Sequence, residues 1–316
     1  MIPPTGIRTV STAGLNAYAE LVIPARKLAT RSAWALALLL VLGGCRVPLT
    51  TPFSVAADGV AQFRVEVVAT TPHDAQAYTQ GLVVEGDQLF ESTGSRRRPT
   101  PDSGGRQTVG PSSLRRVDRA TGTILQQIEL EPQLFGEGLT RVGDRLIQLT
   151  WLSHQAIVYD AETFDELERF SYDTEGWGLC FDGDQLIMSD GSAELSLRDP
   201  VTFEERRRVT VRLLNDPVAR INELECVDGL VYANVFQTDQ IIIIDPDSGQ
   251  VAGVIDASGL LDRGADPGAG VLNGIAYDAT SERFFITGKL WPTLFEVRWI
   301  QGPGAGATGS DARADE

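Results

Sequence analysis

One pattern recurs through most of this chain: an apolar run, a glycine turn and a second apolar run. The turns lie at Gly86, Gly143, Gly183 and Gly229, and a looser copy surrounds Asn273–Asp278. Alternating apolar residues on both sides of a glycine turn are typical of β-hairpins. The repeat therefore predicts a protein built largely of hairpins.

A second hairpin follows each of the first four. Its marker is an apolar run that ends in an aspartate before a turn, at Asp118, Asp160, Asp199 and Asp245. Two hairpins make a four-stranded unit, and units that recur at intervals of roughly 40 to 57 residues are typical of propeller blades. The five units predict an all-β fold, a five-bladed β-propeller with almost no helix.

The fifth unit ends at Leu294–Trp299 without the final strand of the other units. The earlier segment Phe63–Ala69 has a matching alternating pattern. We expect it to pair with the last unit and to close the ring, because closure covers an exposed sheet edge. Within the first unit, we expect Arg96–Ser113 to be a long loop.

An apolar stretch precedes the repeats. Residues 34–44 follow a positive segment, are too short to span a bilayer, and fit the apolar part of a secretory signal. The Leu42–Cys45 tail resembles the lipobox of bacterial lipoproteins, in which the cysteine is acylated; a plain signal or an anchoring helix is the alternative. We expect an exported, periplasmic protein that meets the membrane only through a lipid anchor at Cys45. Arg46 favours the outer membrane.

These segments divide the chain into a signal peptide, a tether, the propeller and a disordered tail, at residues 1–44, 45–62, 63–300 and 301–316.

The composition excludes some classes of function. A formal charge of −16 and a pI near 4.6 repel phosphate backbones, so nucleic acid is not an expected partner. His73, His154 and three cysteines are too few for a histidine-rich zinc site or a zinc finger. No cofactor is expected, although the channel could hold a structural Ca²⁺ ion on oxygen ligands.

Cys180 and Cys226 each lie three residues before the turn glycine of their unit, and so on adjacent inner strands. Export permits a disulfide. Inner strands of neighbouring blades are, however, commonly farther apart than the roughly 4–7 Å between Cα atoms that a disulfide needs. We therefore expect two buried free thiols.

The residues six positions before each turn glycine begin the innermost strands, which should start at one end of the central channel. They are Gln80, Glu137, Trp177 and Glu223, with Asn222 and Asn273 at or beside the same place. Polar residues here can simply bond across the hub. A tryptophan and an acid that share the ring with amides favour a small-molecule pocket instead.

The scarcity of lysine is a second indication of a small-molecule pocket. Lys27 and Lys289 are the only lysines among 27 basic residues. Such a composition keeps lysine where a compact ammonium is needed, although a surface lysine retained by chance is the simpler alternative. Lys289 follows a strand of the last unit, in a loop able to face the axis. Aromatic residues that end strands or flank the ring could line the same mouth: Tyr78, Phe135, Trp151 and Phe236.

Several stretches, in this order, resemble the plant and bacterial glutaminyl-peptide cyclotransferases of the papaya-latex type. The similarity spans about residues 63–299 and includes Tyr78–Leu82, Phe135–Thr140, Gly176–Leu179, Asn222–Glu225 and Gly288–Pro292. The resemblance implies a five-bladed propeller. It also implies a metal-independent reaction in which an N-terminal glutamine of a peptide becomes pyroglutamate and ammonia is released.

The resemblance further implies that Glu137 transfers the proton as general acid and base, assisted by Asn222 and Lys289. It implies that the pocket is shaped by Gln80, Tyr78, Phe135, Trp151, Trp177 and Phe236. The family usually has Phe at position 78 and Trp at position 236, and the smaller ring at 236 bears on substrate affinity. If Glu137 only bonds across the hub, Glu223 is the next candidate for the acid.

The chemistry fits these residue types. The α-amine of the substrate attacks its own γ-carboxamide, so the enzyme supplies geometry, a proton carrier and a partner for the developing oxyanion. A carboxyl whose pKa is raised by burial beside tryptophans suits the proton carrier, while the charge of Lys289 opposes that rise.

Two other classes of function stay open. A non-catalytic, lipid-anchored propeller that binds or assembles other proteins would not need Glu137 and Lys289 to meet. A Ca²⁺-dependent propeller hydrolase of lactones or phosphoesters would use Glu137, Asn222 and Asn273 as oxygen ligands. For the cyclotransferase, the expected partners are peptides and proteins with an N-terminal glutamine, and the chain is expected to be a monomer.

Overall fold

The computed structural model describes residues 59–95, 97–98, 107–108 and 111–302. Within these ranges the regular elements are all β-strands, and no helix occurs. The same ranges accordingly contain no apolar helix of the length that crosses a membrane. The predicted signal peptide, Cys45 and nearly all of the tether and tail lie outside the described residues.

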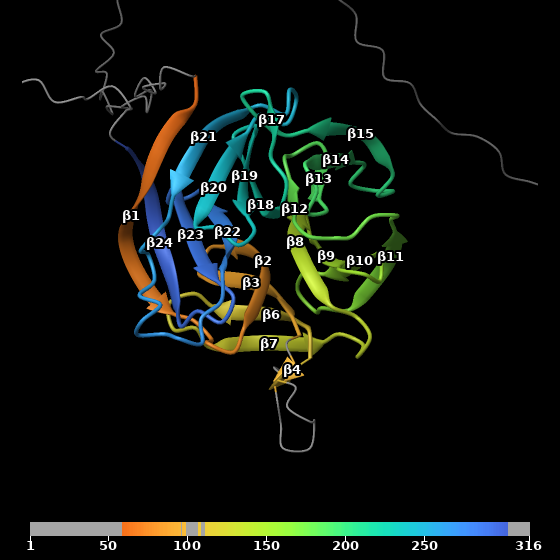
Figure 1. The fold of residues 1–316 in the computed structure, drawn as a ribbon. Coiled ribbons are helices and arrows are strands. Elements are labelled where there is room, and N and C mark those ends of the chain that lie inside the picture. The colour runs from red at the N-terminus through yellow and green to blue at the C-terminus, as the bar shows by residue number, and fades with distance from the viewer. Residues whose placement is uncertain (1–58, 96, 99–106, 109–110, 303–316) are drawn as a thin grey trace, which may run out of the picture. The chain divides into compact units, whose positions relative to one another are not determined.

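Three four-stranded sheets follow one another along the described chain (Figure 1). The first contains β2 (Tyr78–Glu85), β3 (Gln88–Gly94), β6 (Ser113–Asp118) and β7 (Ile124–Glu129). The second contains β8 (Gly136–Val142), β9 (Arg145–Thr150), β10 (Gln155–Asp160) and β11 (Glu166–Ser171). The third contains β12 (Leu179–Phe181), β13 (Leu186–Ser189), β14 (Glu194–Arg198) and β15 (Glu205–Thr210).

The remaining long strands form one eight-stranded sheet with two four-stranded halves. One half contains β18 (Ile221–Val227), β19 (Leu230–Val235), β20 (Gln240–Ile244) and β21 (Val251–Asp256). The other contains β22 (Leu272–Asp278), β23 (Arg283–Gly288), β24 (Thr293–Gln301) and the first strand of the chain, β1 (Ala61–Pro72). Two-residue strands form two further small pairs: β4 (Arg97–Arg98) with β5 (Gln107–Thr108), inside the predicted long loop, and β16 (Arg212–Leu213) with β17 (Asp216–Pro217).

Strand β1 joins the two ends of the described chain. It runs antiparallel to β24, with Phe63 opposite Gln301 and Ala69 opposite Glu296. Its first residues, Ala61–Arg64, also run parallel to β21. The predicted pairing of Phe63–Ala69 with the last unit is therefore present, and β1 connects the two halves of the large sheet.

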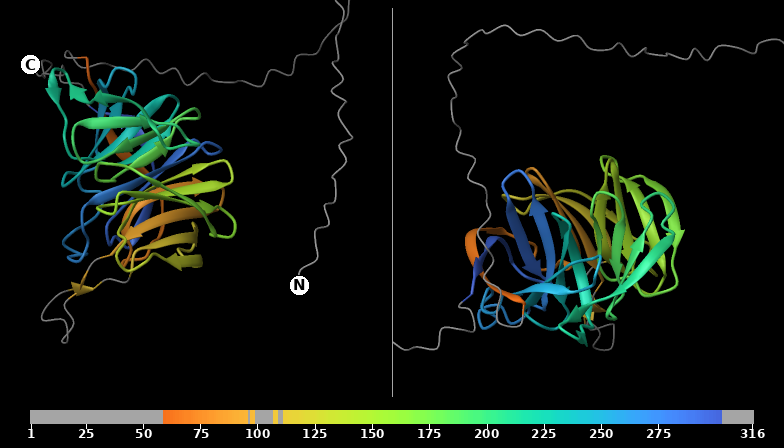
Figure 2. Two further views of the ribbon diagram at one scale, coloured as in Figure 1. Left: turned by 90° about the vertical axis from the view of Figure 1, so that its right-hand side faces the viewer. Right: turned by 90° about the horizontal axis from the view of Figure 1, so that it is seen from above.

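The first strand of each repeat lies toward a common centre (Figure 1). Strand β2 contacts β8, β8 contacts β12, and the contacts continue through β18 and β22 back to β2. In the side views of Figure 2 the twisted sheets stand one beside another around this centre. The arrangement is propeller-like, and it brings the starts of the inner strands together.

The apolar core lies between neighbouring sheets, with one cluster at each junction around the ring. At the junction of the first sheet with the β22–β24 group, for example, Leu82 and Leu89 pack with Phe285 and Leu294. Burial of these side chains supplies the main driving force that holds the sheets together.

Close contact between inner strands depends on glycine. A β-carbon on Gly138 would lie 2.6 Å from the backbone nitrogen of Leu179 on β12, and one on Gly178 would overlap the carbonyl oxygen of Asn222. A larger side chain would push the strands apart, so glycine allows the backbones to approach.

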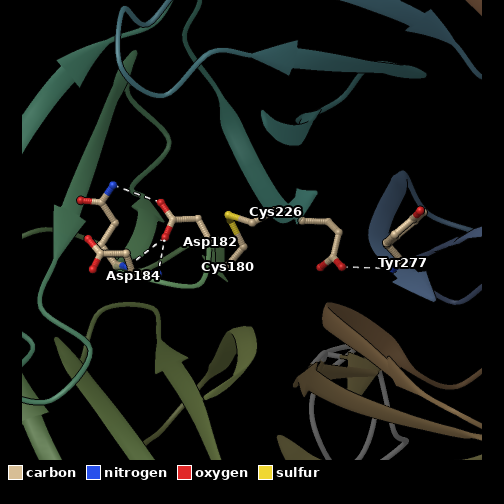
Figure 3. Close-up of a disulfide and its surroundings, with 7 residues drawn as sticks. Cys180, Asp182, Asp184, Cys226 and Tyr277 are labelled. Carbon is tan, nitrogen blue, oxygen red and sulfur yellow. Dashed lines mark hydrogen bonds between the residues drawn. A yellow bond between two sulfur atoms is a disulfide. The ribbon is translucent and has the colours of Figure 1, made fainter. Parts of the chain in front are cut away.

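Cys180 on β12 and Cys226 on β18 form a disulfide, with their Cα atoms 5.5 Å apart (Figure 3). The prediction of two free thiols is wrong. It assumed a wide gap between neighbouring inner strands, but these strands converge at the hub, where Gly178 packs on Asn222. Their separation therefore falls within the range that a disulfide bridges.

Candidate active site

The inner strands are irregular at the ring positions. The pairing register shifts within four of them, at the positions occupied by Gln80, Glu137–Gly138, Asn222–Glu223 and Asn273–Gly274. A β-bulge bends a strand and re-aims a side chain. The ring side chains are thereby released from the regular alternation of their sheets.

A cavity of about 290 Å³ lies at this end of the inner strands. It is lined by Tyr78, Gln80, Phe135, Glu137, Trp151, Trp177, Asn222, Phe236 and Lys289. The structure thus brings together the nine residues for which the resemblance implied a catalytic or substrate-binding role. Their individual roles remain predictions.

Glu137 is only 5% exposed, and its Oε1 accepts a hydrogen bond from Gln80 Nε2 at 2.9 Å. Burial raises the pKa of Glu137 well above its usual range; the charge of Lys289 opposes this rise and that of Glu175 adds to it. Burial therefore outweighs the lysine. A carboxyl with a raised pKa can both accept and return a proton near neutral pH.

The amide of Gln80 is itself held in one orientation. Asn273 Nδ2 donates to Gln80 Oε1 at 3.3 Å and to the carbonyl oxygen of Thr79 at 3.0 Å. Because the Gln80 oxygen already accepts this bond, its nitrogen faces Glu137. Asn273 does not line the cavity, and it acts on Glu137 through Gln80.

Lys289 follows β23 in a tight turn. Its backbone N–H donates to Val271, and the next N–H, of Leu290, donates to Ala77 on the segment before β2. The Nζ atom lies 4.9 Å from the ring centre of Tyr78 and 5.2 Å from that of Phe236. Burial lowers the pKa of Lys289 to about 8, although the charge of Glu137 opposes the shift.

Aromatic rings form the walls of the cavity. Phe135 meets Tyr78 and Trp151 edge-on, at 6.2 and 5.7 Å between ring centres. Trp177 meets Phe236 edge-on at 5.5 Å. Edge-to-face pairs of this kind stabilise one another and leave apolar faces for a substrate.

The sequence reasoning missed Glu175, which precedes β12 in the chain. Its Oε2 accepts hydrogen bonds from Trp151 Nε1 at 2.7 Å and from Trp177 Nε1 at 2.8 Å. Glu175 lies outside the ring register, so counting back from the turn glycines does not reach it. An acid two residues before a ring tryptophan is the only signal that the sequence offers.

Glu223 occupies the position where the other four units have glycine, and it lies outside the cavity lining. Its two carboxyl oxygens accept hydrogen bonds from the backbone of Leu82 on β2, at 3.3 Å, and of Ile275 on β22, at 2.7 Å. Burial and the charge of Glu225 raise its pKa well above the usual range. Glu223 therefore links three inner strands at the hub.

Of the three ligands considered for Ca²⁺, Glu137 and Asn222 line the cavity and Asn273 does not. In the part of the chain that the structure describes, no three His, Cys, Asp or Glu side chains cluster closely enough to hold a metal ion.

Comparison with known proteins gives the family. A family model described as glutamine cyclotransferase matches residues 37–299. The chain belongs to this family. A glutaminyl-peptide cyclotransferase of Arabidopsis thaliana is 41% identical over 243 residues, which are 75% of this chain and 72% of the plant protein.

A solved structure agrees with this assignment. The crystal structure of Myxococcus xanthus glutaminyl cyclase is similar with a TM-score of 0.68 and 35% sequence identity, over 77% of this chain and 100% of that chain. The resemblance inferred from short motifs is thus confirmed for the family as a whole.

Proposed function

We propose that this protein is a glutaminyl-peptide cyclotransferase, which converts an N-terminal glutamine of a peptide to pyroglutamate and releases ammonia. The observation that carries the proposal is the cavity in which the Glu137 carboxyl, the Lys289 ammonium and the Asn222 amide lie among aromatic walls. Membership of the family supports it. The proposal includes a five-bladed propeller, with each four-stranded group as one blade.

The substrate binds with its glutamine side chain folded back on its own α-amine. Aromatic walls hold the aliphatic part of this side chain and exclude water. The nucleophile belongs to the substrate itself, so no nucleophile of the protein is needed, and the pocket contributes by holding the α-amine close to the carboxamide.

Glu137 carries the proton in both directions. The α-nitrogen forms a bond to the carbonyl carbon of the γ-carboxamide and passes a proton to the Glu137 carboxylate; the same carboxyl then protonates the amide nitrogen, which leaves as ammonia when its bond to that carbonyl carbon breaks. Gln80 orients the carboxyl through its hydrogen bond. Asn222 and Lys289 stabilise the negative charge that develops on the amide oxygen.

We also propose that the protein is exported and anchored through lipid on Cys45, that it is a monomer, and that its chemistry needs no metal. The disulfide between Cys180 and Cys226 supports export, because disulfides persist in oxidising compartments. Mass analysis of the N-terminal peptide from the native host tests the anchor.

Ammonia release from a glutamine-initiated dipeptide by the purified protein tests the activity, with an asparagine-initiated dipeptide as the control. We expect release from the first only, and unchanged activity after treatment with EDTA. Activity lost to EDTA and restored by Ca²⁺ would favour a metal-dependent enzyme. Absence of any ammonia release would favour the non-catalytic binding module.

A further inference from the structure

Glu175 joins two walls of the cavity that belong to different sheets. Trp151 follows the last residue of β9, whereas Trp177 precedes β12, and one carboxylate oxygen of Glu175 accepts both indole N–H groups. We propose that Glu175 is a positioning residue, which fixes both tryptophans at the width that the glutamine side chain of the substrate requires. The proposal rests on the proposed function, because that function defines the substrate.

The two indole rings differ in the packing contacts that restrain them apart from Glu175. The ring of Trp177 packs edge-on against Phe236 and closely over Gly191. Trp151 is 37% exposed, and its ring contacts Phe135. A side chain with this much exposure keeps rotamer freedom unless a polar bond restrains it. The carboxylate therefore matters most for Trp151.

The carboxylate also acts on the proton carrier through its charge. Among the residues that the structure describes, three titratable side chains influence Glu137 or respond to its charge: Lys289 after β23, Glu175 before β12, and Tyr172, which follows β11. Tyr172 stays neutral, since burial raises its pKa further above neutrality. Loss of the negative charge at Glu175 leaves Lys289 to act alone, so the pKa of Glu137 falls.

Two substitutions separate these effects. Glu175→Gln keeps an oxygen that can accept both indole N–H groups but removes the charge. Glu175→Ala removes the bonds and the charge together. Asp173→Asn is the matched control, since Asp173 is an exposed acid two residues away in the same loop.

For Glu175→Ala we expect KM to rise about tenfold while kcat changes less, because the walls no longer fit the substrate. Glu175→Gln should keep KM within about twofold, and the acidic limb of its kcat/KM profile should move to lower pH. Asp173→Asn should match the wild type in both respects. A Glu175→Ala variant with unchanged KM, or a Glu175→Gln variant that loses affinity as strongly as Glu175→Ala, would overturn the proposal.

Tryptophan fluorescence tests the positioning without any activity. Glu175→Ala should alter the emission spectrum of the full-length protein and raise quenching by acrylamide, whereas Glu175→Gln and Asp173→Asn should leave both close to wild type. An unchanged spectrum in Glu175→Ala would refute the positioning role. If the wild type released no ammonia, the proposed function would fail, and this fluorescence comparison would still decide whether Glu175 holds the tryptophans.

Discussion

At the scale of single residues, the site depends on two buried charges of opposite sign. Burial raises the pKa of Glu137 and lowers that of Lys289 to about 8, while the charge of each group opposes the shift of the other. In both groups burial disfavours the charged form, and it outweighs the attraction between the two charges. Substitutions at these two positions should affect turnover through different steps.

Glu137→Gln keeps the shape of the side chain and a hydrogen-bonding amide, but it cannot carry a proton. We expect kcat to fall by roughly 10²–10⁴-fold with the fold intact. Lys289→Ala should lower kcat less, because the ammonium stabilises charge and does not transfer the proton. Ammonia release at substrate saturation measures both, with circular dichroism as the control for folding. If the Glu137→Gln variant keeps activity within a few-fold of wild type, Glu137 is not the group that carries the proton.

The pKa of Lys289 predicts a second result. Below about pH 8 the side chain is charged and stabilises the oxyanion; above it the charge and its contribution are lost. The ratio of kcat/KM between wild type and Lys289→Ala should therefore decline as pH rises through about 8. The ionisation of the substrate amine affects kcat/KM equally in both proteins, so its effect cancels in the ratio. A ratio that stays constant from pH 7 to 10 would contradict the role of the charge.

At the scale of elements, a buried ion pair holds the segments that carry the site. His73 donates from Nδ1 to the carbonyl oxygen of Trp291, two residues after Lys289, and its Nε2 lies 3.2 Å from Glu91 on β3. Glu91 also accepts a hydrogen bond from Thr79, which stands between Tyr78 and Gln80 in the sequence. The pair thus connects the start of β2 with the turn after β23.

The His73–Glu91 ion pair contributes to the free energy of unfolding only within a limited range of pH. Burial lowers the pKa of His73, but the charge and hydrogen bond of Glu91 outweigh it and leave the pKa above 6.5. For Glu91, burial raises the pKa, but His73 and Arg115 outweigh it and leave the pKa below 4.5. The contribution of His73 is therefore lost as pH rises through its folded pKa, and that of Glu91 is lost as pH falls through its own.

We expect His73→Gln to lower the free energy of unfolding by about 3 kcal/mol near pH 6, since it leaves a buried carboxylate without one partner. The loss should shrink above the folded pKa of His73, where the wild type has also lost the charge. Denaturant unfolding at pH 6 and pH 9 measures this difference. An equal loss at both pH values would show that packing, and not the ion pair, is responsible.

At the scale of the whole molecule, repetition made the fold and much of the site predictable. Counting six residues back from a turn glycine reaches Gln80 and Glu137 because β2 and β8 have their bulges at the same distance from the turn. The same count misplaces the fourth unit, where Asn222 lines the cavity and Glu223 takes the glycine position.

What the sequence could not supply depends on contacts between repeats. Glu175 gains its partners only when Trp151 and Trp177 arrive from different sheets. The disulfide likewise depends on how closely β12 and β18 approach at the hub, and this distance is set by packing at Gly178. The sequence pattern of a single repeat therefore predicts neither the hydrogen bonds of Glu175 nor the disulfide.

The disulfide should stabilise the ring without serving the chemistry. It closes a segment with a sequence separation of 46 residues, and a loop of this size contributes about 2–4 kcal/mol through the lost freedom of the unfolded chain. Replacing both Cys180 and Cys226 by alanine should lower the free energy of unfolding by this amount. Activity at 25 °C should persist, because the close packing of Gly178 on Asn222 holds β12 near β18 independently. Peptide mapping after alkylation of the denatured, unreduced wild type should recover the two cysteines in one linked peptide pair. Two alkylated thiols there, or unfolding energies that agree between the variant and wild type, would refute the stabilising bond.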